Sequence, residues 1–98
     1  MQSTYTVAIG YNAGQNTQSG LSVAIGALSG QNNQLDHSVA VGPAAGQLYQ
    51  GQNAVAIGFK SGQSTQGKNC ISIGQASGSN NQQNYALAIG NNLSLIHI

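Results

Sequence analysis

The stretch Val7-Ala8-Ile9-Gly10 decides the fold, because near-copies of it return every 16 residues along the chain. A period held this strictly, without insertion or deletion, indicates that every repeat forms one structural unit that stacks on the next. The sequence therefore predicts a solenoid. The further copies occupy residues 23–26, 39–42, 55–58, 71–74 and 87–90.

Glycine recurs at two places in this repeat. With Gly10 taken as position 8, the repeats are residues 3–18, 19–34 and so on to 83–98; glycine holds position 8 in all six and position 12 in five. Glycine at fixed offsets marks backbone that needs a positive φ or a close approach, so we expect these residues at the corners of the coil. They are Gly10, Gly14, Gly26, Gly30, Gly42, Gly46, Gly58, Gly62, Gly74, Gly78 and Gly90.

Positions 4 to 7 read as a strand of period two, with aliphatic residues at positions 5 and 7 and small residues at positions 4 and 6. Periodicity alone leaves open which face points inward. We interpret the aliphatic residues as the core: Val7, Ile9, Val23, Ile25, Val39, Val41, Val55, Ile57, Ile71, Ile73, Leu87 and Ile89. The small residues of position 6 are then predicted to face neighbouring protomers: Ala8, Ala24, Ala40, Ala56, Ser72 and Ala88.

No stretch between successive copies has room for a helix, so the fold class expected is an all-β parallel β-roll of six 16-residue repeats. Restriction of both strand faces predicts that more than one copy of the chain assembles, because a solvent face would accept charged residues. Position 16 is glutamine in the first five repeats, and we expect these side chains to bond amide to amide along the stack.

Composition excludes several partners. The 98 residues carry full charges only at Lys60, Lys68 and Asp36, for a net charge of +1, which provides no basic patch for nucleic acid and no polybasic face for anionic lipid. No apolar run has the roughly 20 residues of a membrane-spanning helix, and the first residues do not resemble a signal peptide. We expect no nucleic-acid partner and no direct membrane contact in this segment.

The chain also lacks a set of catalytic residues. Its one aspartate precedes His37 at variable positions of the repeat, and its single cysteine, Cys70, replaces serine or alanine at a small position. An enzyme needs a nucleophile with a base, paired carboxylates or a metal set. We therefore predict no enzyme activity, no cofactor and no metal site. We interpret Asp36 and His37 as corner residues without a catalytic role.

The two ends suggest a fragment. Residues 1–92 follow the repeat from the first residue, so further repeats are expected beyond both ends. Residues 93–98 depart from it, and they resemble the in-frame translation of a transposon-end sequencing adaptor rather than native sequence. A hydrophobic capping strand is the alternative.

The phrase Ser-Val-Ala-Ile-Gly followed by two variable residues and then alanine or serine, at residues 22–29 with variants at 38–45 and 54–61, resembles the head repeats of trimeric autotransporter adhesins, the YadA-like head domain. The resemblance covers residues 2–92. It implies a left-handed parallel β-roll, a homotrimer and a place on the bacterial outer surface through an anchor that this segment lacks. The period of 16 departs from the family's usual period of about 14.

The resemblance implies a structural and binding function: attachment to host cells, matrix proteins or other surfaces through a host matrix protein or cell-surface receptor. Similar repeats occur in viral tail-fibre-like proteins, so a virion fibre is one alternative. A self-polymerising Gln/Asn-rich β-solenoid is another, because open strand edges and amide ladders favour end-to-end growth. The candidate recognition residues are exposed corner residues: Tyr11, Tyr49, Phe59 and Lys60.

Overall fold

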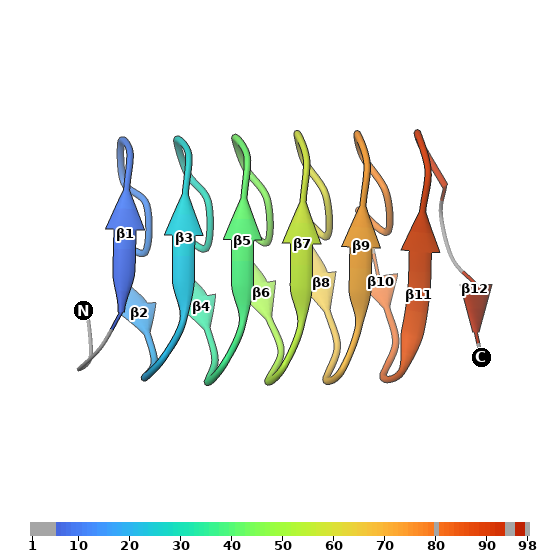
Figure 1. The fold of residues 1–98 in the computed structure, drawn as a ribbon, viewed down its shortest axis with the longest axis horizontal. Helices are drawn as coiled ribbons and strands as arrows, with labels where there is room; N and C mark the ends of the chain where they lie inside the picture. The colour runs from blue at the N-terminus through green and yellow to red at the C-terminus, as the bar shows by residue number, and fades with distance from the viewer. Residues whose placement is uncertain (1–5, 80, 94–95, 98) are drawn as a thin grey trace.

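Short parallel strands stack along one axis in a β-solenoid (Figure 1). The computed structural model describes residues 6–79, 81–93 and 96–97, and these contain no helix. The front sheet consists of β1 (Val7–Ile9), β3 (Val23–Ile25), β5 (Val39–Val41), β7 (Val55–Ile57), β9 (Ile71–Ile73), β11 (Ala86–Ile89) and β12 (Ile96–His97). The back sheet consists of β2 (Thr17–Gln18), β4 (Asn33–Gln34), β6 (Tyr49–Gln50), β8 (Thr65–Gln66) and β10 (Asn81–Gln82).

The strand register reproduces the sequence period. Val7 pairs with Val23 and Val55 with Ile71, so each parallel partner lies 16 residues along the chain. In Figure 1 the chain runs up the front sheet, crosses to the back, descends there and advances toward β11, which makes the coil left-handed. The predicted fold class, a left-handed parallel β-roll, is confirmed for the single chain.

The sixth repeat closes differently from the others. Five complete turns carry both a front and a back strand, whereas the sixth carries β11 and then β12, which pairs antiparallel with β11. Residues 96–97 thus lie against the last front strand. This geometry is that of a cap at the end of the stack, and it is compatible with either origin of residues 93–98.

The corner glycines have the backbone that glycine favours. At position 8 Gly58 has a φ of 122°, and a Cβ there would lie 2.8 Å from the carbonyl oxygen of Gly74 in the next turn. At position 12 Gly62 has a φ of 54°. Glycine is required at position 8 for two reasons, a positive φ and a close approach of successive turns.

Two further corner positions also have positive φ, although glycine does not occupy them. At position 10 Lys60 has a φ of 61°, and at position 3 His37 has a φ of 60°. Their amide groups donate to carbonyl groups of the preceding turn, as in Lys60 N to Pro43 O at 2.9 Å. The full set is Asn12, Leu21, Leu28, His37, Ala44, Asn53, Lys60, Asn69, Ala76, Tyr85 and Asn92. Hydrogen bonds between turns therefore hold non-glycine residues in a conformation that costs each of them roughly 1–2 kcal/mol.

The interior is built from the small residues, which corrects the predicted assignment of the two strand faces. Ala24, Ala40, Ala56, Ser72 and Ala88 have no exposed surface, whereas Ala8 in the first turn is exposed. These residues were predicted to form a trimer face, and in the four full turns from β3 to β9 and at β11 they lie inside the roll instead. They cannot contact another protomer.

The aliphatic residues, predicted to be the core, point outward. Ile57 is 37% exposed and Ile9 is 58% exposed. The physical reason is the width of the roll: a Cβ added to Gly62 would already lie 3.3 Å from the hydroxyl of Ser72 across the interior. With the glutamine of position 16 already between the two sheets, position 6 has room for alanine and serine but not for valine and isoleucine, so the aliphatic side chains must take the outer face. None of the twelve aliphatic residues is buried.

Glutamine fills the remaining interior space. The side chain of Gln66 is fully buried, and its Nε2 donates to the backbone oxygen of Val55 at 2.6 Å. The same bond, from position 16 to position 5 of the same repeat, is made by Gln18, Gln34, Gln50 and Gln82. The predicted amide-to-amide ladder is wrong for most of position 16: among the described residues there, only Gln34 donates to another glutamine side chain, that of Gln50, at 3.1 Å. That ladder forms at position 13 instead, where Gln31, Gln47 and Gln63 each donate to the glutamine one turn earlier.

Candidate interface on the aliphatic face

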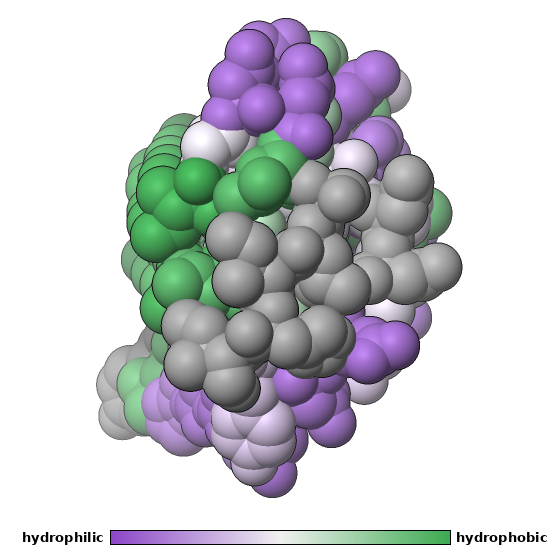
Figure 2. All heavy atoms as spheres, turned by 90° about the vertical axis from the view of Figure 1, so that its right-hand side faces the viewer, coloured by the Kyte–Doolittle hydropathy of each residue, from purple (hydrophilic) through white to green (hydrophobic). Residues whose placement is uncertain are grey.

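The outer surface of the front sheet is a continuous apolar strip, which we call the aliphatic face. It consists of Val7, Ile9, Val23, Ile25, Val39, Val41, Val55, Ile57, Ile71, Ile73, Leu87 and Ile89. Figure 2, which looks along the stack from the end that carries β12, shows hydrophobic atoms gathered on this side and hydrophilic atoms at the two corners. The strip therefore runs along one side of the molecule.

Strand geometry explains why the strip is unbroken. Side chains of a strand alternate between faces, so positions 5 and 7 emerge together on the outer surface of each front strand. Parallel in-register pairing then places each aliphatic residue directly beside its counterparts, as Ile57 lies between Val41 and Ile73. The three charged side chains of Lys60, Lys68 and Asp36 all belong to the corners. The aliphatic face carries no charge.

The candidate recognition residues do not form one cluster. Phe59 and Lys60 lie at the corner that follows the front strands, with the Lys60 ammonium nitrogen 5.2 Å from the centre of the Phe59 ring. Tyr11 occupies the same corner three turns earlier, and is exposed. Tyr49 belongs to β6 in the back sheet. The structure thus separates Tyr49 from the other three.

A hollow of about 430 Å³ lies beside Tyr49 on the back of the roll. Its lining comes from the back strands and from the corner that follows them: Tyr49, Thr65, Gly67, Gln82, Gln83 and Asn84. A smaller hollow of about 280 Å³ lies at the same corner, between Ser19, Leu35, Asp36 and Gln52. Sequence reasoning found neither hollow, because each brings together residues of different repeats at positions that vary.

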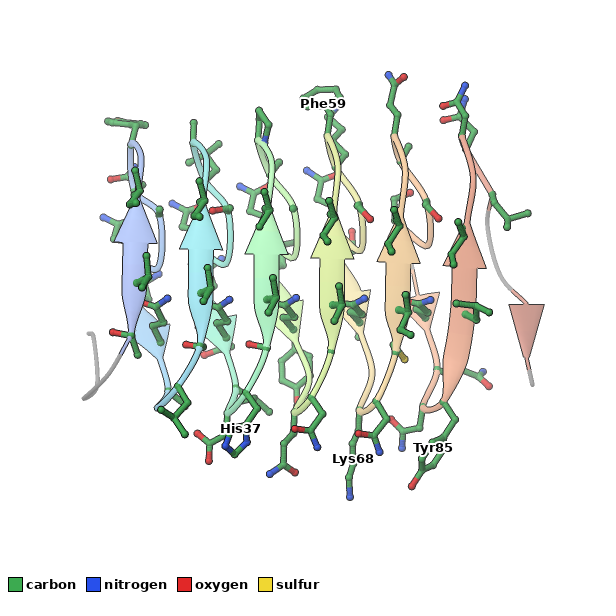
Figure 3. All side chains as sticks on the ribbon, viewed as in Figure 1. His37, Phe59, Lys68 and Tyr85 are labelled. Carbon is green, nitrogen blue, oxygen red and sulfur yellow. The ribbon has the colours of Figure 1, made fainter. Side chains whose placement is uncertain are left out.

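The titratable side chains do not assemble into a catalytic or metal site within the described residues. Groups of three or more histidine, cysteine, aspartate or glutamate residues able to hold a metal ion are absent from that part of the chain. His37 and Asp36 are exposed at a corner, and Figure 3 shows His37 pointing outward there. They stand apart from the interior.

Cys70 is buried and holds its proton firmly. Desolvation raises the pKa of its thiol above the ordinary value of 9.0, and the thiol donates to the backbone oxygen of Gln83 at 2.7 Å. A thiol in this state is a poor nucleophile. Cys70 therefore packs at position 4 as the serine and alanine of other turns do.

No protein-family model, curated protein or solved structure matches this chain significantly. Among the described residues, none forms a helix long and apolar enough to cross a membrane. Function must accordingly be argued from the surfaces of the roll.

Proposed function

We propose that this chain is a segment of the head of a homotrimeric, surface-exposed adhesin, which attaches its bearer to host cells, matrix proteins or other surfaces. The observation that carries the proposal is the aliphatic face. Twelve aliphatic residues form one uncharged strip along the outer surface of the front sheet. Large exposed apolar patches on soluble proteins mark sites of association.

The partner that fits the aliphatic face best is another copy of the same chain. Each copy offers a flat, uncharged strip as long as the stack, and the longest dimension of the molecule is 32 Å. Side-by-side packing of such strips around a common axis buries all of them at once and closes the assembly. The back sheet and both corners then face outward, and those are the surfaces a receptor would meet.

The number three and the adhesive role come from the resemblance of the repeat motif to YadA-like heads. The same resemblance favours the cell surface as the location, with the anchor supplied by sequence beyond this segment. A virion fibre would use the same trimeric roll, so the assembly test below bears equally on that alternative. Adhesion itself would show as binding of the assembled rolls to extracellular matrix proteins or host cells in a solid-phase assay.

Sedimentation velocity with the full chain tests the assembly. We expect a single species of three times the chain mass of 9.9 kDa, stable on dilution. Ile57→Lys places a charge at the middle of the aliphatic face, where assembly would bury it without a partner, so we expect dissociation to monomers that retain the β-sheet circular dichroism spectrum.

Asn33→Lys is the matched control, because it adds the same charge at an exposed position of β4 on the opposite sheet. It should leave the trimer intact. A wild-type monomer, or an Ile57→Lys variant with the wild-type mass, would contradict the proposed assembly. Concentration-dependent growth of particles that bind thioflavin would favour the self-polymerising fibre instead.

A further inference from the structure

The hollow beside Tyr49 spans successive turns of the roll. Tyr49 lies in the third repeat, Thr65 in the fourth, Gly67 in the fifth and Asn84 in the sixth. The lining crosses three adjacent back strands, β6, β8 and β10, which lie about 4.8 Å apart, so it extends over roughly 10 Å of the stack. The hollow is long enough for a ligand with two rings.

Gly67 helps to explain why the hollow exists at this place. Position 1 carries Leu35 in the third repeat and Gln83 in the sixth, but Gly51 and Gly67 in the two repeats between them. The backbone of the next turn is close here: a Cβ on Gly67 would lie 2.8 Å from the backbone nitrogen of Asn84. Gly67 therefore projects no side chain into the space that the other lining residues surround.

The lining offers an aromatic ring together with neutral hydrogen-bonding groups. Tyr49 is 39% exposed, and the side chains of Thr65 and Gln83 are exposed as well. Within the described part of the chain, the Tyr49 and Thr65 hydroxyls and the Gln83 amide have no hydrogen-bond partner. Asn84 accepts from the amide of Lys68 at 2.9 Å through Oδ1, which leaves its Nδ2 free to donate.

The lining carries no charge, so it does not suit an anionic ligand. None of the six lining residues is charged. Lys68 follows Gly67, but Figure 3 shows its side chain extending outward from the corner. A ligand that binds here must therefore be neutral, must have an apolar surface for the Tyr49 ring and must carry several hydroxyl or amide groups.

We propose that this hollow binds a neutral disaccharide unit of a glycan. A pyranose ring has an apolar C–H surface, which stacks on aromatic side chains, and hydroxyl groups around its edge, which suit the amides and hydroxyls of the lining. The volume of about 430 Å³ lies within the range of pockets for ligands of this size. The site belongs to the back sheet, so it stays accessible when the aliphatic face is covered.

The biological meaning of this glycan site rests on the proposed adhesive function. Glycan binding itself does not, because a single roll carries the whole hollow. Titration of the isotope-labelled full chain with cellobiose and with lactose, followed by amide nuclear magnetic resonance, tests it. We expect saturable shifts at residues 65–67 and 82–84 with at least one of the two sugars, with dissociation constants of roughly millimolar order because the hollow is open and shallow.

Tyr49→Ala should weaken binding at least about fivefold, because it removes the stacking surface, whereas Tyr49→Phe should weaken it less. Tyr85→Ala is the matched control: Tyr85 is 59% exposed but lies outside the hollow, and its loss should leave the titration unchanged. Absence of saturable shifts up to about 50 mM of either sugar would overturn the inference. So would shifts that survive Tyr49→Ala, or binding restricted to an anionic sugar such as glucuronate.

The molecular mass of the protein in the same samples distinguishes failure of the proposed trimer from failure of the proposed glycan site. A trimer that binds neither sugar would overturn the glycan site and leave the assembly standing. A monomer that binds cellobiose or lactose through Tyr49 would overturn the assembly and leave the glycan site standing.

Discussion

Glycine at position 8 is the residue on which the closeness of successive turns depends. At Gly58 the φ of 122° is rare for residues with a side chain, and the carbonyl of Gly74 occupies the space where a Cβ would lie. The adjacent corner residue Lys60 differs, because its φ of 61° lies in the left-handed region that other residues tolerate at some cost. Gly58 and Lys60, although they share a corner, therefore differ in the side chains that they tolerate.

Gly58→Val should therefore be far more destabilising than Lys60→Ala. The valine must either move the next turn or leave the corner conformation, and we expect a loss of about 3 kcal/mol or more in the free energy of unfolding. Lys60→Ala changes an exposed side chain and should cost less than about 1 kcal/mol. Chemical denaturation of the two variants measures both. Similar midpoints would mean that the turn can shift to admit a side chain at position 8.

Each front strand has two faces with opposite requirements: the inner face needs small side chains, and the outer face carries large aliphatic ones. Its inner face meets the back sheet across a gap filled by small residues and by the glutamine of position 16. Three of these buried glutamines, Gln18, Gln34 and Gln66, have an Oε1 atom without a hydrogen-bond partner within the described residues. In the fifth turn the Ser72 hydroxyl donates to Oε1 of Gln82 at 2.8 Å and removes this deficit.

Ala56→Ser should stabilise the roll for the same reason. Ala56 stands ten residues before Gln66, as Ser72 does before Gln82, so the new hydroxyl is placed to donate to the unpartnered Oε1. We expect the free energy of unfolding to rise by about 1 kcal/mol. Thermal and urea unfolding provide the measurement.

Ala40→Ser is the control for this substitution, because Oε1 of Gln50 already accepts from Gln34. It should raise stability less than Ala56→Ser does. Equal gains at the two positions would show that serine helps the interior in some way other than by completing the glutamine. Ala56→Arg, by contrast, would place a charge inside the roll and should unfold it whatever the state of assembly.

The whole molecule is a one-dimensional stack, in which each turn contacts only its neighbours. Front strands pair with the strand of the next turn, and back strands do the same. Stability in such a stack is approximately a sum of turn and interface contributions. Removal of a complete turn should therefore shorten the roll without changing its architecture.

Deletion of residues 51–66 tests this additivity. Gln50 then joins Gly67, every position of the repeat keeps its register, and we expect the same β-sheet spectrum with a lower melting temperature. Deletion of residues 51–58 removes half a turn and moves Gln66 to position 8, where only glycine fits, so we expect no folded protein. A folded half-turn variant would contradict the requirement for register.

The sequence by itself determined the repeat, and with it most of the fold. A strict 16-residue period with no room for a helix admits only a short-stranded parallel coil, and the glycines of positions 8 and 12 show where that coil turns. Left-handed backbone at positions 3 and 10 could not be predicted in this way, because residues as different as Leu28, Ala44 and Lys60 occupy position 10. Hydrogen bonds from the neighbouring turn impose that conformation, and composition does not reveal them.

Only the tertiary structure decided which face of the strand is the inside. A period of two separates the aliphatic residues from the small ones but does not orient them, and the usual preference for buried aliphatic residues gave the wrong orientation. Ala56 is fully buried and Ile57 is 37% exposed because the closely spaced sheets, with a buried glutamine between them, leave room only for a small side chain at position 6. The width of the interior depends on both strands and all corners of a turn together, so it is set by the assembled coil and not by any one stretch of the chain.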